Sequence, residues 1–198
     1  MTAEIFNRHR EGMAAWVCGE TEREEQLDLL GLIGIADPPY PGLADYYIDH
    51  PDYAGEVDHA ELLARLARDY DGWALCTSSD ALPMLLGICA TLGLRPRVAA
   101  WLRGSRRHAT RGPVRAWEPV LYVPARDVVD EGWPDDALHY VSRPRITDPG
   151  RVIGAKPPAF SDWLFRLVGA RAGDKLDDLF PGSGAISRAW SVFTEDDA

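Results

Sequence analysis

A short segment of the chain combines an acid, two prolines and an aromatic ring directly after an apolar run. The segment is Asp37-Pro38-Pro39-Tyr40, and the apolar run before it ends at Ala36. The prolines remove two backbone donors and fix two φ angles, so the surrounding carbonyls remain as acceptors beside a carboxylate and a ring. Such a site could hold a planar amino group by two acceptors and stack the base on the tyrosine. The alternative is a strand that simply ends in a Pro-rich turn, which is what most Pro-Pro pairs are.

A glycine-rich turn near the C-terminal end is the second segment that could do chemistry. Asp177-Asp178-Leu179-Phe180-Pro181-Gly182-Ser183-Gly184 reads as a strand that runs into a Gly-x-Gly turn and then a helix. Glycines let the backbone come close to a ligand, and a helix N-terminus offers free N–H groups. Ligands of α/β sheets bind at such turns, outside the carboxyl ends of the strands. The turn is too short for a phosphate-binding P-loop, and no Gly-Lys-Ser/Thr follows it.

Arginines gather in one stretch of an otherwise acidic chain. The net charge is −10, yet no acidic residue lies between Ala81 and Trp117. A basic stretch on an acidic protein can bind phosphates locally, which favours contact with nucleic acid; a solvated Arg-rich loop is the alternative. The seven arginines of the stretch are Arg95, Arg97, Arg103, Arg106, Arg107, Arg111 and Arg115, and we select Arg103, Arg106, Arg107 and Arg111 as nucleic-acid contacts.

Length and composition indicate a single globular domain. The 198 residues are 46% hydrophobic and 26% charged, which suits an ordinary core. The Met1 end carries no signal pattern, and no apolar run is long enough to span a membrane. The three cysteines, Cys18, Cys76 and Cys89, are scattered, which suits a reducing cytoplasm and predicts no metal site.

Hydrophobic periodicity predicts the elements that must position these motifs. Strands are expected at 30–36, 73–77, 97–102, 115–123 and 176–180, and helices at 3–16, 58–70, 81–92, 161–167 and 184–192. Strands and helices alternate with short links, which indicates an α/β fold with a parallel-rich sheet. Residues 127–155 contain Pro, Gly and Asp with little periodicity, and we expect a short irregular insertion there.

Start and stop signals define two of these helices. Asp58 resembles an N-cap, and Glu61 three residues later completes a capping box. Ser79 or Asp80 is the predicted cap of the next helix, which Gly93 ends. The predicted apolar faces are Ala60, Leu63, Leu66 and Ala67 in the first helix, and Trp163, Leu164 and Leu167 in the helix at 161–167.

Together the motifs resemble those of the DNA amino-methyltransferases, which use S-adenosylmethionine to methylate adenine N6 or cytosine N4. Asp37–Tyr40 matches the catalytic tetrapeptide of that family, and Asp178–Gly184 matches its cofactor motif of the type Asp-x-Phe-x-Gly-x-Gly. Lys156-Pro157 resembles the Lys-Pro segment that precedes the cofactor motif. The resemblance covers roughly residues 29–123 and 153–190, including Trp101 and the segment from Trp117 to Tyr122. The catalytic motif comes first, which is the permuted order of the β group and favours a nucleic-acid amine as target.

The resemblance implies a role for each matching residue. Asp37 and the Pro38 carbonyl would accept hydrogen bonds from the target NH₂, with Pro39 completing the rigid turn, and Tyr40 would stack on a base that has left the helix. An Asp at the first position of the tetrapeptide favours adenine as the target base, because the cytosine-N4 enzymes of the family more often begin it with Ser. The residues implied to bind the cofactor are Asp178 near its amino-acid end, Phe180, Gly182, Ser183 and Gly184 along it, and Lys156 and Pro157 beside its methionine portion.

The resemblance also implies a reduced Rossmann-like methyltransferase sheet flanked by helices. Only 14 residues follow Gly184, whereas the family normally continues with two more strands, so about five strands and an adenosine pocket open on one side are expected. Residues 3–28, a second subunit or a partner protein could cover that side, or cofactor binding could be weak. The insertion at 127–155 stands in place of a target-recognition domain. A non-catalytic module that binds nucleic acid or a partner, and an enzyme acting on RNA, a free nucleobase or cytosine N4, stay open as alternatives.

Overall fold

The computed structural model of the chain describes residues 30–48, 55–103, 116–126, 133–139 and 156–196. Within these ranges six strands form one sheet in the order β5-β3-β4-β2-β1-β6. Four α-helices cover the sheet, and a 3-10 helix, η2, follows the tetrapeptide. The strands are β1 Leu32–Ala36, β2 Gly72–Cys76, β3 Arg97–Leu102, β4 Trp117–Val123, β5 Ala137–His139 and β6 Lys175–Asp178; the helices are η2 Ala44–Tyr47, α3 His59–Asp69, α4 Leu82–Thr91, α5 Pro158–Leu167 and α6 Ala185–Asp196.

The sheet is mixed, with one antiparallel strand inside it. β1 runs parallel to both β2 and β6, and β3 runs parallel to β5, whereas β4 is antiparallel to its neighbours β2 and β3. The expectation of a parallel-rich sheet is therefore confirmed except at β4. The hydrophobic pattern of β4 does not reveal its antiparallel direction, because β4 is as buried as a parallel strand would be.

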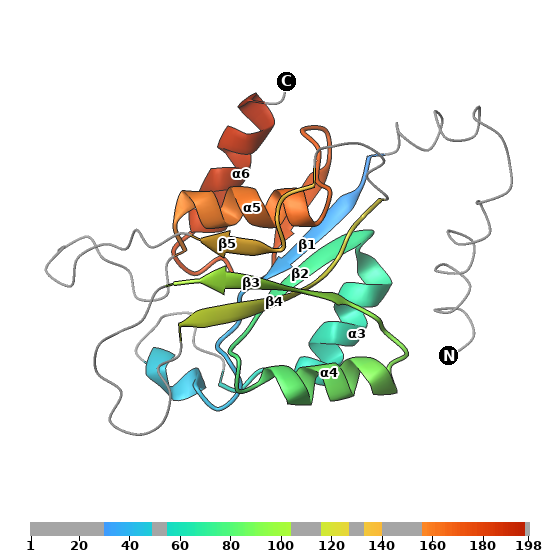
Figure 1. Cartoon of the computed structure of the whole chain (residues 1–198), viewed down its shortest axis with the longest axis vertical. Helices are drawn as coiled ribbons and strands as arrows, with labels where there is room; N and C mark the ends of the chain where they lie inside the picture. The colour runs from blue at the N-terminus through green and yellow to red at the C-terminus, as the bar shows by residue number, and fades with distance from the viewer. Residues whose placement is uncertain (1–29, 49–54, 104–115, 127–132, 140–155, 197–198) are drawn as a thin grey trace, which may run out of the picture.

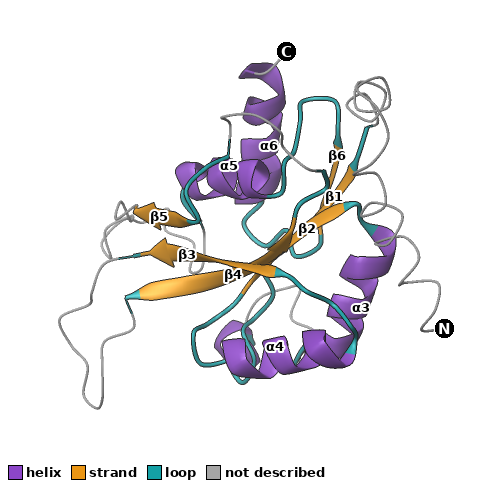
Figure 2. Cartoon of the chain, turned by 45° about the vertical axis from the view of Figure 1, so that its right-hand side comes forward, coloured by secondary structure: helices purple, strands orange, loops and turns teal. Residues whose placement is uncertain are grey.

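Two helix pairs cover the two faces of the sheet (Figures 1 and 2). α5 and α6 pack on one face, where Ile33 and Ile35 of β1 point, and α3 and α4 pack on the other face, where Ala36 points. This alternation is the two-residue period of a strand that is buried on both sides. None of the helices in the described ranges is long and apolar enough to cross a membrane.

The predicted helices are present, with corrections at their ends. Asp58 caps α3 through its carboxylate, which accepts from the backbone N–H groups of Ala60 and Glu61 at 3.0 and 3.1 Å. The N-cap of α4 is Ala81 and no side chain caps it, so the predicted caps Ser79 and Asp80 are wrong; Ser78 Oγ accepts from Ala81 N at 3.2 Å in the turn before the helix. Gly93 follows α4 with φ of +72°, as a helix stop requires.

The apolar faces are mostly as predicted. Leu63 and Leu66 are fully buried, but Leu62 joins them and Ala60 is exposed. Trp163, Leu164 and Leu167 are all buried on α5, which begins three residues earlier than expected.

The insertion at 127–155 is not wholly irregular, because its residues 137–139 form β5 on β3. Three residues are too few to show a period in the sequence. The helix expected at 3–16, the segment 3–28 and the rest of the insertion, save 133–136, lie outside the described residues.

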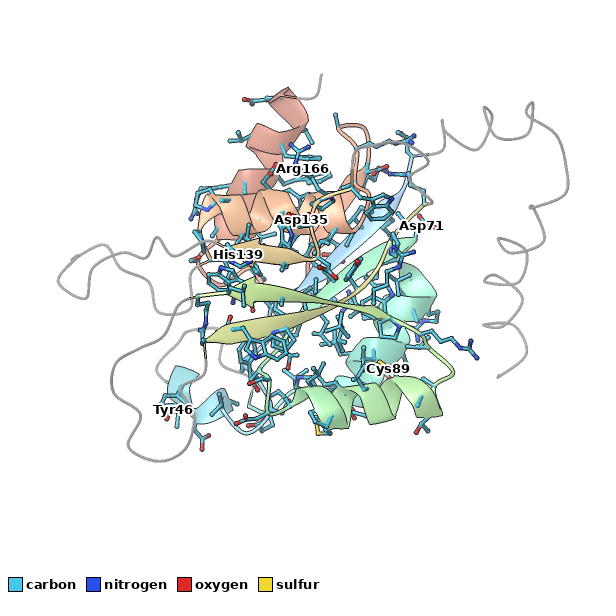
Figure 3. All side chains as sticks on the ribbon, viewed as in Figure 1. Tyr46, Asp71, Cys89, Asp135, His139 and Arg166 are labelled. Atoms are coloured by element: carbon cyan, nitrogen blue, oxygen red, sulfur yellow. The ribbon has the colours of Figure 1, made fainter. Side chains whose placement is uncertain are left out.

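The carboxyl ends of β1 and β6 meet at one edge of the sheet, because the two strands are parallel. β1 lies between β2 and β6 in the sheet. The chain continues from β1 to β2 on one side, whereas β6 lies on the other side, so β1 and β6 flank a switch in strand order. Tyr46, just beyond β1, and Asp71, just before β2, lie at opposite ends of the sheet (Figure 3). Ligands of open α/β sheets bind outside the carboxyl ends at such a switch point, so the tetrapeptide lies where a ligand is expected.

Candidate active site

The tetrapeptide and the glycine-rich turn lie side by side, although 136 residues, 41–176, separate Tyr40 from Asp177. Ile35 of β1 pairs with Asp178 of β6, and Leu179 N donates to Ile35 O at 2.9 Å. Asp37 and Phe180 therefore continue from neighbouring strands at the same edge. The fold brings together the two segments that the sequence singled out.

Lys156 directly precedes Pro157, the N-cap of α5, and its side chain extends to the tetrapeptide. Its Nζ donates to both carboxylate oxygens of Asp37, at 2.8 and 2.7 Å. The two side chains are 8% and 16% exposed, so this is a largely buried ion pair. Burial by itself lowers the pKa of the Lys156 ammonium, but Asp37 and the neighbouring Tyr40, Cys76 and Glu118 together outweigh it, and the pKa stands well above its ordinary value. Lys156 is a fixed positive charge beside the acid.

Tyr40 is held at its hydroxyl by groups from two other elements. The hydroxyl donates to Glu118 Oε2 of β4 at 3.0 Å, and the Tyr40 hydroxyl oxygen accepts from Lys156 Nζ at 3.4 Å. Arg103, directly after β3, forms an ion pair with Glu118 Oε1. Burial is the main cause that raises the pKa of Tyr40 well above its ordinary value. Tyr40 is thus an uncharged hydrogen-bonding phenol.

Aromatic rings and a thiol complete the surroundings of these charges. Trp101 of β3 and Phe160 of α5 pack with ring centroids 4.7 Å apart, and Lys156 Nζ lies 5.8 Å from the Phe160 ring and 5.6 Å from the Tyr40 ring. Cys76, at the end of β2, is buried next to Asp37, and burial followed by the Asp37 charge raises the pKa of its thiol. The site combines a lysine–carboxylate pair with stacking surfaces, which suits a planar ligand that carries a hydrogen-bond donor.

The glycine-rich turn adopts backbone angles that favour glycine. Gly182 and Gly184 have φ of +46° and +71°, and Gly184 N donates to Pro181 O at 2.6 Å. A Cβ on Gly182 would have only the Phe180 carbonyl oxygen within 4 Å, at 3.8 Å, so the space beside this residue is open. The turn presents bare backbone at the edge of the sheet.

Asp178, the first residue of the cofactor motif, has a carboxylate close enough to Asp37 for the two charges to interact. Ser187 Oγ donates to its Oδ2 at 2.9 Å, whereas its Oδ1 is buried without a hydrogen-bond partner. Burial raises the pKa of this carboxyl, and the nearby charge of Asp37 acts in the same direction. An unpartnered buried acceptor indicates a place for a ligand donor.

The structure adds one residue that the sequence did not single out for chemistry, Glu118. Its only signal was an acid inside an otherwise apolar strand, directly after the acid-free stretch. Arg103, selected as a nucleic-acid contact, lies inside the site on Glu118. Its nucleic-acid role stays a prediction, and the other selected residues, Arg106, Arg107 and Arg111, lie outside the described residues.

Comparison with known proteins gives a match in structure and none in sequence. No family model matches the chain, and no curated protein matches it in sequence. The crystal structure of the M1.HpyAVI–SAM complex (SAM, S-adenosylmethionine) is similar with a TM-score of 0.52 and 17% identity, over 87% of this chain and 83% of that one. The structure of M1.HpyAVI matches with a TM-score of 0.51 and 15% identity, over 87% and 82%. At this identity the likeness is one of fold: a mixed sheet with helices on both faces, as in Rossmann-like methyltransferases.

Proposed function

We propose that the chain is a SAM-dependent methyltransferase that acts on the exocyclic amino group of a nucleobase, the N6 of adenine in DNA. The observation that carries this proposal is the meeting of Asp37–Tyr40 and Asp178–Gly184 at adjacent carboxyl ends of β1 and β6. A target-amine site and a cofactor turn must lie side by side if a methyl group is to pass between them. The likeness in fold to a SAM complex supports the same function.

On the target side, Asp37 and the Pro38 carbonyl would accept from the two N–H groups of the amine. A carboxylate offers about four acceptor positions, so Asp37 can hold the Lys156 ammonium and still accept from a base. Two acceptors fix the plane of the NH₂ group and point the nitrogen lone pair to one side, and Tyr40 would stack on the base. Alignment of this kind supplies most of the rate, since the transfer needs little acid–base help.

On the cofactor side, the residues present fit SAM. The unpartnered Oδ1 of Asp178 suits the ammonium of the methionine portion, and the open space beside Gly182 admits a ligand close to the backbone. When bound, SAM supplies a methyl group on a sulfonium that leaves as a neutral thioether. Phe180, Ser183 and Gly184 would line the same ligand, while the position of Lys156 on Asp37 assigns this lysine mainly to the target side.

For the substrate, the arginine stretch supports DNA. A base that is methylated at its amino group must first leave the double helix, and phosphate contacts hold the strand while it does so. Arg106, Arg107 and Arg111 are the proposed phosphate contacts, with Arg103 at the edge of the site. A second subunit or a partner protein is a further proposal for the side of the cofactor pocket beyond β6.

The test is calorimetry with SAM, followed by transfer of tritiated methyl to unmethylated DNA. We expect SAM to bind and label to enter duplexes that contain adenine, and not duplexes of guanine and cytosine alone. Label in the latter would shift the target to cytosine N4, and label in RNA alone would replace DNA as substrate. Absence of both SAM binding and methyl transfer, in the monomer and in any oligomer, would refute the proposal that the chain is a methyltransferase.

A matched pair of glycine variants tests whether SAM binds at the glycine-rich turn. Gly182→Ala places a methyl group in the open space of the turn, and Gly93→Ala imposes a similar backbone strain at the opposite end of the sheet, since both glycines have positive φ. We expect Gly182→Ala alone to weaken SAM binding. Equal weakening by both variants would mean that strain, and not ligand contact, causes the loss.

A further inference from the structure

Glu118 is a buried carboxylate whose two oxygens contact different parts of the site. It is 8% exposed, with Oε2 accepting from the Tyr40 hydroxyl at 3.0 Å and Oε1 paired with Arg103. A buried carboxylate is costly unless it is paired and hydrogen-bonded. Its place in β4, opposite Trp101 of β3, is set by the strand ladder. Glu118 is therefore a rigid acceptor aimed at Tyr40.

Tyr40 needs its hydroxyl for something other than stacking. A ring that only stacks could be a phenylalanine, yet this hydroxyl donates to Glu118 and has Lys156 Nζ 3.4 Å away. The backbone of Tyr40 is also fixed, because its carbonyl accepts from Leu43 N at 2.8 Å in the turn that follows the prolines. These two contacts fix the axis of the ring, and because a phenolic O–H prefers the plane of its ring, a hydroxyl that donates to a fixed acceptor also favours one ring plane.

Arg103 restrains the acceptor in turn. Its guanidinium pairs with Glu118 and lies 5.8 Å from the Trp101 ring, and its side chain is only 25% exposed. A guanidinium is planar and rigid, so the pair limits the rotation of the carboxylate. The contacts run from Arg103 through Glu118 to Tyr40.

We propose that Glu118, fixed by Arg103, is a positioning residue that sets the plane of the Tyr40 ring against the target base. The proposal rests on the proposed function, because only a stacked base gives the orientation of the ring a kinetic consequence. Glu118 touches neither the amine nor the cofactor, so its loss lowers the rate of transfer and leaves SAM affinity unchanged. Its positioning effect passes through the Tyr40 hydroxyl.

A double-mutant cycle tests this route. Tyr40→Phe keeps the ring and removes the hydroxyl, Glu118→Leu removes the acceptor, and we expect each to lower kcat about tenfold, as for a lost hydrogen bond to a charged group. The double variant should be no slower than Tyr40→Phe, because both changes remove the same contact. Glu118→Gln keeps an acceptor for the hydroxyl and should recover most of the rate, even if Glu118→Leu does not fold. Losses that multiply in the double variant, or a Glu118→Gln variant as slow as Glu118→Leu, would overturn the proposal.

A readout on the protein without substrate separates this proposal from the proposed function. NMR of ring-labelled tyrosine should show slow flipping of the Tyr40 ring, accelerated by Glu118→Leu. The control is Asp162→Leu, which breaks a carboxylate–arginine pair with Arg166 on the exposed side of α5 and should leave the ring unchanged. If the ring responds while the wild type transfers no methyl group, the proposed function fails and the contact stands. If methyl transfer occurs and the flipping rate of the Tyr40 ring is the same in Glu118→Leu as in the wild type, the positioning role is refuted.

Discussion

β1 has a largely buried ion pair at each of its two ends, and the two pairs are built differently. At the amino end, Arg126 pairs with Asp174, which also binds the backbone of Gly31 just before the strand. At the carboxyl end, Lys156 pairs with Asp37 just after the strand. Both pairs join segments far apart in the sequence. They differ in the number of donors on each carboxylate, in the kind of cation and in the exposure of the acid.

The carboxylate of Asp174 is saturated. Arg126 donates to both of its oxygens, Nη1 to Oδ2 at 2.6 Å and Nη2 to Oδ1 at 2.8 Å, and the backbone N–H groups of Gly31 and Arg171 add bonds of 2.6 and 2.8 Å. The side chain is 1% exposed. The Arg126 guanidinium also donates to Gly169 O at 2.7 Å. Four fixed donors leave no place for a ligand, so this pair ties the start of β1 to the loops before β6 and after β4.

The carboxylate of Asp37 has acceptor positions left. A single flexible ammonium serves both of its oxygens, the only other donor in the described residues is the weak thiol of Cys76, and the side chain is 16% exposed at the mouth of the strand. An ammonium is a point charge on a mobile stem, whereas a guanidinium is a rigid fork. Donor saturation therefore separates a structural carboxylate from one that can still accept from a substrate.

The largest expected effect is at Asp37. Asp37→Ala should lower methyl transfer by about 10³-fold, since it removes an oriented acceptor of the reacting amine. SAM affinity, measured by calorimetry, should stay nearly unchanged. The control is Asp174→Asn, which should keep the wild-type rate per folded molecule. Equal loss of transfer and of SAM binding in Asp37→Ala would mean that the carboxylate belongs to the cofactor side.

The next effect is on stability and comes from the other end of the strand. Arg126→Met leaves Asp174 buried without its charged partner, which should lower the free energy of unfolding by about 3–5 kcal/mol. Denaturant unfolding measures the change. The comparison would be wrong if Arg126→Met were as stable as the wild type while Lys156→Met were strongly destabilised, because the saturated pair would then not be the structural one.

The two pairs also show what the sequence could predict. The strand before Asp37, the Asp58 cap and the Gly93 stop follow from local chemistry, and the structure confirms them. The contact between Lys156 and Asp37 joins residues 119 positions apart, and that between Tyr40 and Glu118 joins residues 78 apart. No local pattern encodes such distances. The resemblance implies that Lys156 lies beside the cofactor. That Lys156 contacts Asp37 follows only from the way the folded chain places the start of α5 next to the end of β1.

A smaller effect is expected at Lys156. Lys156→Met keeps the length of the side chain and removes the charge, so Asp37 loses its main orienting partner but keeps its acceptor positions. We expect transfer to fall about tenfold to a hundredfold, less than in Asp37→Ala, as is usual for a residue that acts through another. Steady-state rates on unmethylated DNA measure this. A loss as complete as that of Asp37→Ala would instead make Lys156 a direct participant in the reaction.

The smallest expected effect is a dependence of stability on acidic pH at the saturated end. Burial opposes ionisation of Asp174, but the Arg126 hydrogen bond and the backbone N–H groups outweigh it, and they hold the pKa of this carboxyl below its ordinary value of 3.8. A folded pKa below the unfolded one means that the unfolded chain binds the proton more readily. The stabilisation is therefore complete above the unfolded pKa and is lost as the pH falls below it. The difference in unfolding free energy between the wild type and Asp174→Asn should stay constant above about pH 5 and shrink as the pH falls through 3.8 toward the lower pKa of the folded state. A constant difference would show that shape and hydrogen bonding, and not charge, make the amino end of β1 rigid.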